Sequence, residues 1–288
     1  MGMNDTPNIV VATDLSEGAV PAARWAATVA AAMGGHVVVA HIVEISLKSW
    51  LGARYDILVD AEKRAALEGK VRDWYQQATG EAPAAVDVRV NTCFNGLSEA
   101  VSAHGASLLV MAPTGKGAIA RVVVGSRVQD LASRPPCPLV VVASAERPKR
   151  VAVATDFSPA AGQAITAAAG LAHRVGAELF VTHVAEVPDL PAFEEDLFAD
   201  SFEAFFQEAT ESLKTATEGA GVTAQQVVLK GRAEVALDDF AQQHSIDLLV
   251  LGQTGHDSVL GDLLGSVPRS LIGRMPCSIL VVPTGAEK

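Results

Sequence analysis

The chain has 288 residues, which is enough for two domains of about 140 residues each, and 49% of them are hydrophobic, as is typical of a globular chain with buried strands. Its formal net charge of −11 argues against nucleic acid or an anionic membrane as a partner, because both attract a surplus of Lys and Arg. Three cysteines without CxxC spacing indicate a reducing compartment rather than a disulfide framework or a zinc site. No basic and apolar leader precedes the first strand and no apolar run reaches membrane-spanning length, so we expect a cytoplasmic protein.

The first predicted element is a strand that ends in a polar turn, and the same pattern returns in the second half of the chain. Residues 10–16 read Val-Val-Ala-Thr-Asp-Leu-Ser, and residues 151–158 read Val-Ala-Val-Ala-Thr-Asp-Phe-Ser. In both places a β-branched run is closed by Thr-Asp, and the serines that follow, Ser16 and Ser158, are predicted to cap the next helix.

The similarity between the halves continues along the chain. Residues 39–44 (Val-Ala-His-Ile-Val-Glu) correspond to residues 181–186 (Val-Thr-His-Val-Ala-Glu) at the same offset of 142, and later matches have an offset of 140. A duplication with a small net length difference explains this pattern. We therefore expect two domains, at 1–146 and 147–288, joined by the polar residues 145–150.

Each copy alternates short apolar runs with longer helical patterns, which predicts an α/β fold. Unbroken apolar runs are typical of strands buried on both faces, so we expect a parallel sheet covered by helices. In the second copy the strands are expected near 150–155, 178–184, 225–229, 247–251 and 278–282. The helices are expected at about 159–175, 195–218, 233–244 and 266–274.

The predicted helix at 195–218 has an apolar stripe opposite many acidic residues. The stripe consists of Phe198, Phe202, Phe205 and Ala209 at helical spacing. An amphipathic helix that covers the sheet explains it, and a docking face for a partner protein is the alternative.

A glycine pattern after the fourth strand of the second copy predicts a phosphate site. Gly252 follows a run of four apolar residues, Gly255 comes three residues later, and Gly265-Ser266 follows after nine more. A glycine at the end of a strand lets a ligand approach the backbone, and the start of a helix offers unpaired N–H groups and the positive end of its dipole. The Gly-Lys-Ser/Thr ending of a P-loop does not follow this pattern.

Asp156 closes the first strand of the same copy. In an open parallel sheet, ligands bind beyond the carboxyl ends of the strands where the strand order reverses, so we expect Asp156 to face Gly252. A carboxylate suits ribose hydroxyls or a purine amino group and repels phosphate, which places Asp156 at the nucleoside end of the site. A cap on the next helix is the alternative role, and the two roles are compatible.

With these residues, both halves of the chain resemble the universal stress protein domain from first strand to last. The second half carries that family's nucleotide motif, Gly-two-Gly-nine-Gly-Ser/Thr, at Gly252, Gly255, Gly265 and Ser266. The resemblance implies two doubly wound domains, each with a five-stranded parallel sheet in the order 3-2-1-4-5 and helices on both faces, and pairing of two domains through their fifth strands into an internal pseudo-dimer. It also implies which residues bind an adenine nucleotide: Thr155, Asp156, Val184, Gly252, Gly255, Gly265, Ser266 and Val267.

The first half departs from the motif at its first position, where Ala112 replaces glycine and Pro113 follows. A methyl group at this point would crowd or shift the ribose, and proline removes one N–H. Nucleotide binding in the first half is therefore left open by the sequence. The corresponding residues there are Asp14, Ile42, Gly115, Gly125 and Ser126. Asn95-Gly96 is interpreted as the counterpart of the turn at Lys230-Gly231.

Other polar residues have simpler explanations. His41 and His183 have no ligand-spaced partner beside them, so we expect structural histidines that bond to the backbone. Arginines near the phosphate segments, Arg127 among them, are expected on exposed helix positions or at a terminal phosphate.

The sequence thus predicts a nucleotide-dependent regulator or sensor in stress response that binds ATP, ADP or AMP, with Mg²⁺ held mainly by the phosphates. Its motifs contain no paired nucleophile and base, so an enzyme is not expected beyond weak ATP hydrolysis. A slow ATPase or a phosphoryl or adenylyl transferase is the first alternative. A protein-interaction module with a vestigial nucleotide site is the second.

Overall fold

The chain folds into two compact units, residues 1–147 and residues 148–288, each with a parallel β-sheet between helices. The computed structural model describes residues 6–44, 60–113, 124–186, 199–255 and 264–284. Among the described helices, none combines the length and the apolar character that crossing a membrane requires.

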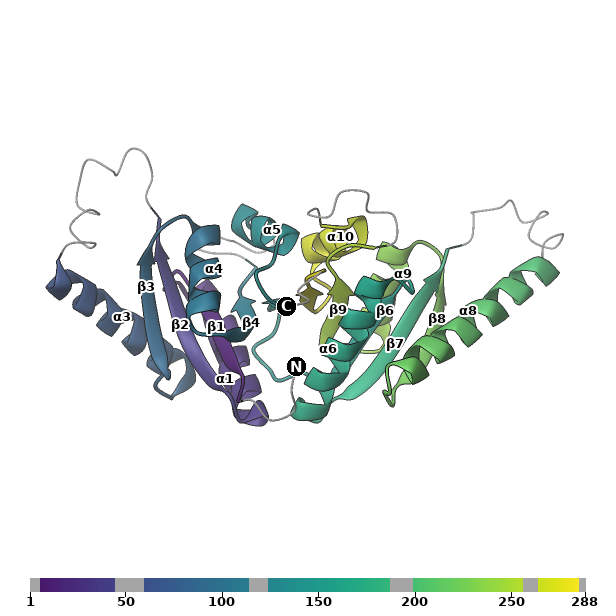
Figure 1. Cartoon of the computed structure of the whole chain (residues 1–288), viewed down its shortest axis with the longest axis horizontal. Helices are drawn as coiled ribbons and strands as arrows, with labels where there is room; N and C mark the ends of the chain where they lie inside the picture. Colours follow the sequence, from purple (N-terminus) through teal and green to yellow (C-terminus); the bar gives the residue numbers. More distant parts are fainter. Residues whose placement is uncertain (1–5, 45–59, 114–123, 187–198, 256–263, 285–288) are drawn as a thin grey trace. The chain divides into compact units, whose positions relative to one another are not determined.

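The first unit is a five-stranded parallel sheet in the order β3-β2-β1-β4-β5. Its elements are β1 (Asn8–Thr13), η1 (Glu17–Ala19), α1 (Val20–Met33), β2 (His36–Val43), α3 (Ala61–Thr79), β3 (Ala85–Val90), α4 (Cys93–Ala103), β4 (Ala106–Met111), α5 (Ser126–Ser133) and β5 (Leu139–Val141). Helix α1 packs against α3 and helix α4 against α5, and Figure 1 shows helices on both sides of the strands.

The second unit repeats this topology in the order β8-β7-β6-β9-β10, which confirms the doubly wound α/β fold. Its elements are β6 (Arg150–Thr155), α6 (Pro159–Val175), β7 (Glu178–Ala185), α8 (Ala199–Gly219), β8 (Gln225–Lys230), α9 (Ala233–Gln243), β9 (Leu248–Gly252), α10 (Ser266–Arg274) and β10 (Ser278–Val282). The predicted strands and helices agree with these bounds to within one residue, except at α8, where residues 195–198 lie outside the described residues.

The central strands are buried as their continuous apolar runs predict. Val10 and Val11 on β1 are fully buried, as are Val151 and Val153 on β6. Burying such side chains stabilises the fold by about 1.5–3 kcal/mol each, and it holds the carboxyl ends of neighbouring strands in register. The polar residues that follow β1 and β6 therefore extend from well-packed strands, which fix their positions.

Two local expectations about polar and turn residues are wrong. Ser158 does cap α6, because its Oγ accepts the N–H of Ala161 at 3.2 Å, but Ser16 does not cap, because its Oγ donates to Asp14 instead. Asn95-Gly96 is not a turn: both residues lie inside α4, where glycine lets the helix approach Ile42. The turn between β8 and α9 uses the positive φ of Gly231, at 106°.

The apolar face of α8 also differs from the expected stripe. Ala209 is buried and Phe202 half-buried, but Phe205 is 42% exposed, while Phe206 is half-buried beneath the ammonium group of Lys230 at 3.9 Å. The helix is therefore rotated so that Phe206 replaces Phe205 on the covering face. Phe198 lies outside the described residues.

Candidate functional site

In each unit the predicted site residues gather where the strand order reverses, at the carboxyl ends of β6 and β9 in the second unit. The chain leaves β6 through a tight turn. Thr155 Oγ1 accepts the N–H of Phe157 at 3.0 Å, and Asp156 Oδ1 accepts the N–H of Ser158 at 3.0 Å. Phe157 has a φ of 63°, which such a side chain rarely adopts. The turn directs the Asp156 carboxylate over the end of the sheet.

The loop that follows β9 passes directly against this carboxylate. A Cβ atom added to Gly255 would lie 2.8 Å from Asp156 Oδ2, closer than real Cβ atoms come to other atoms. Gly252, the last residue of β9, would place a Cβ 3.3 Å from the carbonyl oxygen of Thr254. In this conformation the absence of a side chain at position 255 lets the loop pass against Asp156.

A backbone hydrogen bond brings the start of α10 beside the end of β9. The N–H of Gly265 donates to the carbonyl oxygen of Gln253 at 2.8 Å, and α10 begins at the exposed Ser266, followed by Val267. Gly265 is the N-cap residue and has no side chain with which to cap the helix. The first N–H groups of α10 and the positive end of its dipole are thus suited to an anion.

Val184 lies near the end of β7, next to a histidine that the turn after β6 holds in place. The Nδ1 atom of His183 lies 2.9 Å from the carbonyl oxygen of Thr155, and the ring of Phe157 stacks on the imidazole with centroids 4.3 Å apart. His41 makes the same 2.9 Å contact with Thr13. The expectation of structural histidines bonded to the backbone is confirmed in both units.

The first unit repeats the turn after its first strand. Thr13 Oγ1 accepts the N–H of Leu15 at 2.9 Å, and Asp14 Oδ1 accepts the N–H of Ser16 at 3.0 Å. Leu15 has a φ of 64°, almost the same as its counterpart in the second unit. Asp14 is therefore presented by the same backbone geometry as Asp156.

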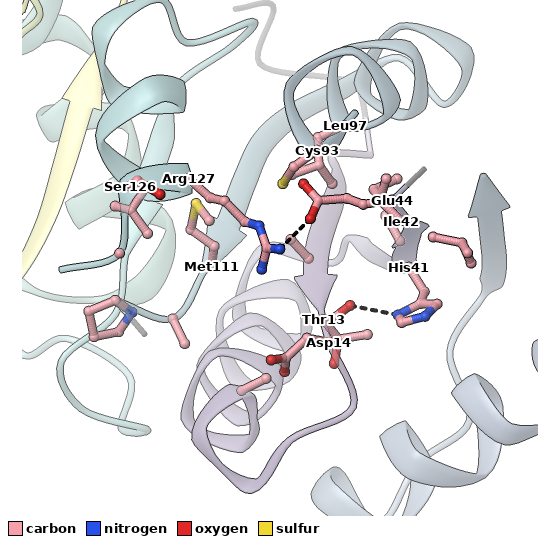
Figure 2. A pocket seen from close by; sticks show the side chains of 18 residues that line it. Thr13, Asp14, His41, Ile42, Glu44, Cys93, Leu97, Met111, Ser126 and Arg127 are labelled. Carbon is pink, nitrogen blue, oxygen red and sulfur yellow. Dashed lines mark hydrogen bonds and ion pairs between the residues drawn. The ribbon is translucent and has the colours of Figure 1, made fainter. Parts of the chain in front are cut away.

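A cavity of about 700 Å³ opens at the carboxyl ends of β1, β2 and β4 in the first unit (Figure 2). Its lining includes four of the predicted residues, Asp14, Ile42, Gly125 and Ser126. The fifth, Gly115, lies outside the described residues. A cavity of this size is in the range of small-molecule and cofactor sites.

Although its motif is altered, the first unit keeps the backbone hydrogen bond that holds the start of the last helix beside the end of the fourth strand. The N–H of Gly125 donates to the carbonyl oxygen of Pro113 at 2.9 Å, in the same place as the bond from Gly265 to Gln253. Ala112, which replaces the first glycine of the motif, lines the cavity and is buried. The proline and the methyl group therefore change the wall of the cavity and leave the helix start in position.

Comparison with known proteins places both units in one family. The model of the universal stress protein family matches residues 6–143 and again residues 148–283. The chain belongs to the universal stress protein family.

Relatives of the same family match either most of the chain or about half of it. A universal stress protein of Mycobacterium tuberculosis is 28% identical over 293 residues, covering 95% of this chain and 96% of the relative. A universal stress protein of Methanocaldococcus jannaschii is 30% identical over 138 residues, covering 46% of this chain and 81% of the relative. The crystal structure of a universal stress protein from Archaeoglobus fulgidus matches with a TM-score of 0.68 at 20% identity, covering 96% of this chain and 98% of that one, which supports the fold.

Two residues of this universal stress protein cavity were not identified from the sequence. Glu44, directly after β2, forms an ion pair with Arg127 on α5, and Figure 2 shows the two side chains reaching toward each other. Cys93, the first residue of α4, lines the same cavity. The equivalence of Glu44 and Glu186 in the repeat was the available signal for Glu44, whereas Cys93 has alanine as its counterpart in the second unit.

Among the described residues, no three His, Cys, Asp or Glu side chains are grouped as ligands of a metal ion would be. The expectation that Mg²⁺ would be held mainly through nucleotide phosphates stays a prediction.

Cys93 provides a chemical reporter for the cavity. Burial raises the pKa of its thiol to about 11, and the negative charge of Glu44 acts in the same direction. Cys137 and Cys277 are more deeply buried, and burial raises the pKa of each to about 12. Since the thiolate is the reactive form, Cys93 should be nearly inert at neutral pH.

We therefore expect the rate of Cys93 alkylation by iodoacetamide to rise about tenfold per pH unit from about pH 8 to pH 10 without reaching a plateau. Peptide mass spectrometry would follow the modification of Cys93 separately from that of the other two cysteines. A rate that levels off near pH 9 would contradict the influence of burial on this thiol.

Proposed function

We propose that this universal stress protein binds a phosphorylated adenosine, ATP foremost, and acts as a nucleotide-dependent regulator or sensor in the stress response of the cytoplasm. The observation that carries the proposal is the juxtaposition in the second domain of Asp156, Gly255 and the glycine-led start of α10. A carboxylate for the nucleoside lies against Gly255, and an uncapped helix start for the phosphates is hydrogen-bonded to Gln253, two residues before Gly255.

Each group in the second domain has a separate task in this proposal. Gly265, Ser266 and Val267 would hold the phosphates, because their N–H groups lie at the positive end of α10. Thr155, Asp156 and Val184 would contact the nucleoside, and Gly252 and Gly255 would allow the ribose to approach the backbone. ADP or AMP would occupy the same place with fewer phosphate contacts.

The proposal is tested first by what the purified protein contains and then by titration. Mass spectrometry of small molecules released from freshly purified full-length protein should detect an adenine nucleotide. Calorimetric titration of nucleotide-free protein with ATP, ADP and AMP should rank the three. If mass spectrometry finds no nucleotide and calorimetry detects no binding, the alternative of a protein-interaction module with a vestigial nucleotide site would be favoured.

The enzymatic alternative requires turnover. The hydrogen bonds described above at Asp156 and His183 join these side chains to the backbone rather than to a nucleophile. Incubation with ATP and quantification of ADP, AMP and phosphate should therefore show turnover far below about 1 per second, which is an ordinary enzyme rate. Faster turnover would exclude a purely regulatory role.

Pairing of the two domains through their fifth strands remains a prediction from the family resemblance.

The first domain allows a direct test of the altered motif. Ala112→Gly should strengthen nucleotide binding in the first domain by about three- to tenfold, because it removes a methyl group from the wall that the ribose would approach. Titration calorimetry of the full-length protein before and after the substitution would measure the change. Identical stoichiometry and affinity would eliminate Ala112 as a cause of any difference between the domains.

A further inference from the structure

The cavity of the first domain holds a charge pair that the second domain replaces. Arg127 is the second residue of α5, and its guanidinium pairs with the carboxylate of Glu44 across the cavity (Figure 2). In the second domain Val267 stands in the place of Arg127. Glu186, the counterpart of Glu44, accepts the N–H of Ala233 at the start of α9, at 3.0 Å.

The position of Arg127 is where a ligand phosphate would arrive. Its backbone lies in the first turn of α5, directly after Gly125 and Ser126, where the helix dipole favours an anion. A guanidinium presents several planar N–H donors that match phosphate oxygens as well as they match a carboxylate. Glu44 therefore forms an ion pair with a cation that the ligand phosphate would also bind.

The pair is weak enough to be exchanged. The side chains of Arg127 and Glu44 are 57% and 37% exposed, and exposed ion pairs of this kind contribute little to stability. A phosphate held at the same time by the helix start and by Arg127 would make more charge-assisted hydrogen bonds than Glu44 makes alone. Exchange of one anion for the other then requires rotation of two side chains and leaves the strands in place.

We propose that Arg127 is the phosphate-selecting residue of the first domain and that Glu44 is an internal anion which the phosphate displaces. This inference rests on the proposed function, since it assumes that the cavity takes an adenine nucleotide. The first domain then offers the phosphate a side-chain cation that Val267 cannot supply in the second domain. It discriminates a phosphorylated adenosine from adenosine itself by a mechanism different from that of the second domain.

Methyl NMR of the full-length protein can follow the first domain alone. Met111 lines the cavity and is one of five methionines in the chain, so its ¹³C-labelled methyl resonance can be assigned by its loss in Met111→Leu. Titrating ATP, and separately adenosine, against that resonance gives the affinity of the first domain for each ligand. Calorimetry on the same samples reports total binding.

Opposite effects are expected from the two members of the pair. Arg127→Gln should weaken ATP binding at the Met111 site about tenfold, and Glu44→Gln should strengthen it about threefold. Neither should change the affinity for adenosine by more than about twofold, because adenosine has no phosphate. Arg134→Gln, which removes a positive charge from the other end of α5, and Glu68→Gln, which removes a negative charge from α3, are the controls and should leave both affinities nearly unchanged.

The outcomes separate this inference from the proposed function. If ATP shifts Met111 but Arg127→Gln leaves its affinity unchanged, or Glu44→Gln lowers it, the inference is wrong while nucleotide binding stands. If ATP binds the protein without shifting the Met111 resonance, and Glu44→Gln does not produce such a shift, the inference is also wrong. If no variant, including the wild type, binds ATP in calorimetry, the proposed function itself fails.

Discussion

Ser266→Glu should weaken ATP binding by the second domain at least about a hundredfold. Ser266 is the first residue of α10, and a carboxylate there would occupy the helix start and repel the phosphates, two effects of about 1.4 kcal/mol or more each. Gly265→Val should act similarly by steric means. Its Cβ atom would make ordinary contacts, at 3.4 Å from Pro268 and 3.5 Å from the carbonyl oxygen of Gln253, and its two methyl groups would stand where the phosphates approach the helix start. Calorimetric titration of the full-length protein measures both effects.

Two matched variants make this result specific. Ser270→Glu adds the same charge one turn further along α10, where the dipole is weaker, and should cost less than about fivefold. Ser126→Glu adds the charge at the start of α5 and should affect only the first domain. Unchanged ATP affinity in both Ser266→Glu and Ser126→Glu would remove the helix starts from the proposed site.

Asp87→Val should lower the free energy of unfolding of the first domain by about 3 kcal/mol. Asp87 is buried on β3 and accepts from both Nε and Nη2 of Arg89, at 2.9 and 2.8 Å, while His104 Nε2 lies 3.0 Å away. The hydrogen bonds that Arg89 donates to Asp87 also raise the pKa of Arg89. Breaking a buried ion pair costs about 3–5 kcal/mol, and both the partial exposure of Arg89 and its second ion pair, with Glu99 at 3.1 Å, place the effect at the lower end.

The second domain supplies the control for this substitution. Val227 and Leu229 occupy the equivalent places on β8, so the chain already contains an apolar version of the same pair. Asp87→Val combined with Arg89→Leu should therefore recover more than half of the lost stability. Hydrogen exchange in urea, followed by peptide mass spectrometry, would assign the change to the first domain. A double variant less stable than Asp87→Val would show that Arg89 stabilises the fold without Asp87.

Local patterns were sufficient to predict the elements and their order. The strands of the second domain are continuous apolar runs bounded by polar turns, and this pattern depends only on neighbours in the chain. The helix starts at Pro159 and Ser266 follow from a capping serine and from an N-cap glycine, which are also local. Where two residues competed for one face, as Phe205 and Phe206 do on α8, the packing of the sheet decided, and the sequence pattern did not.

The sequence by itself determined the repeat, the doubly wound fold and the glycine motif, because periodicity, turn chemistry and internal similarity are written along the chain. Only the tertiary structure decided which side chains meet: that Gly255 lies against Asp156, and that Arg127 reaches Glu44 across a cavity in the domain with the altered motif. Arg127 and Glu44 are 83 positions apart, and no local rule relates residues that the order of the strands brings together.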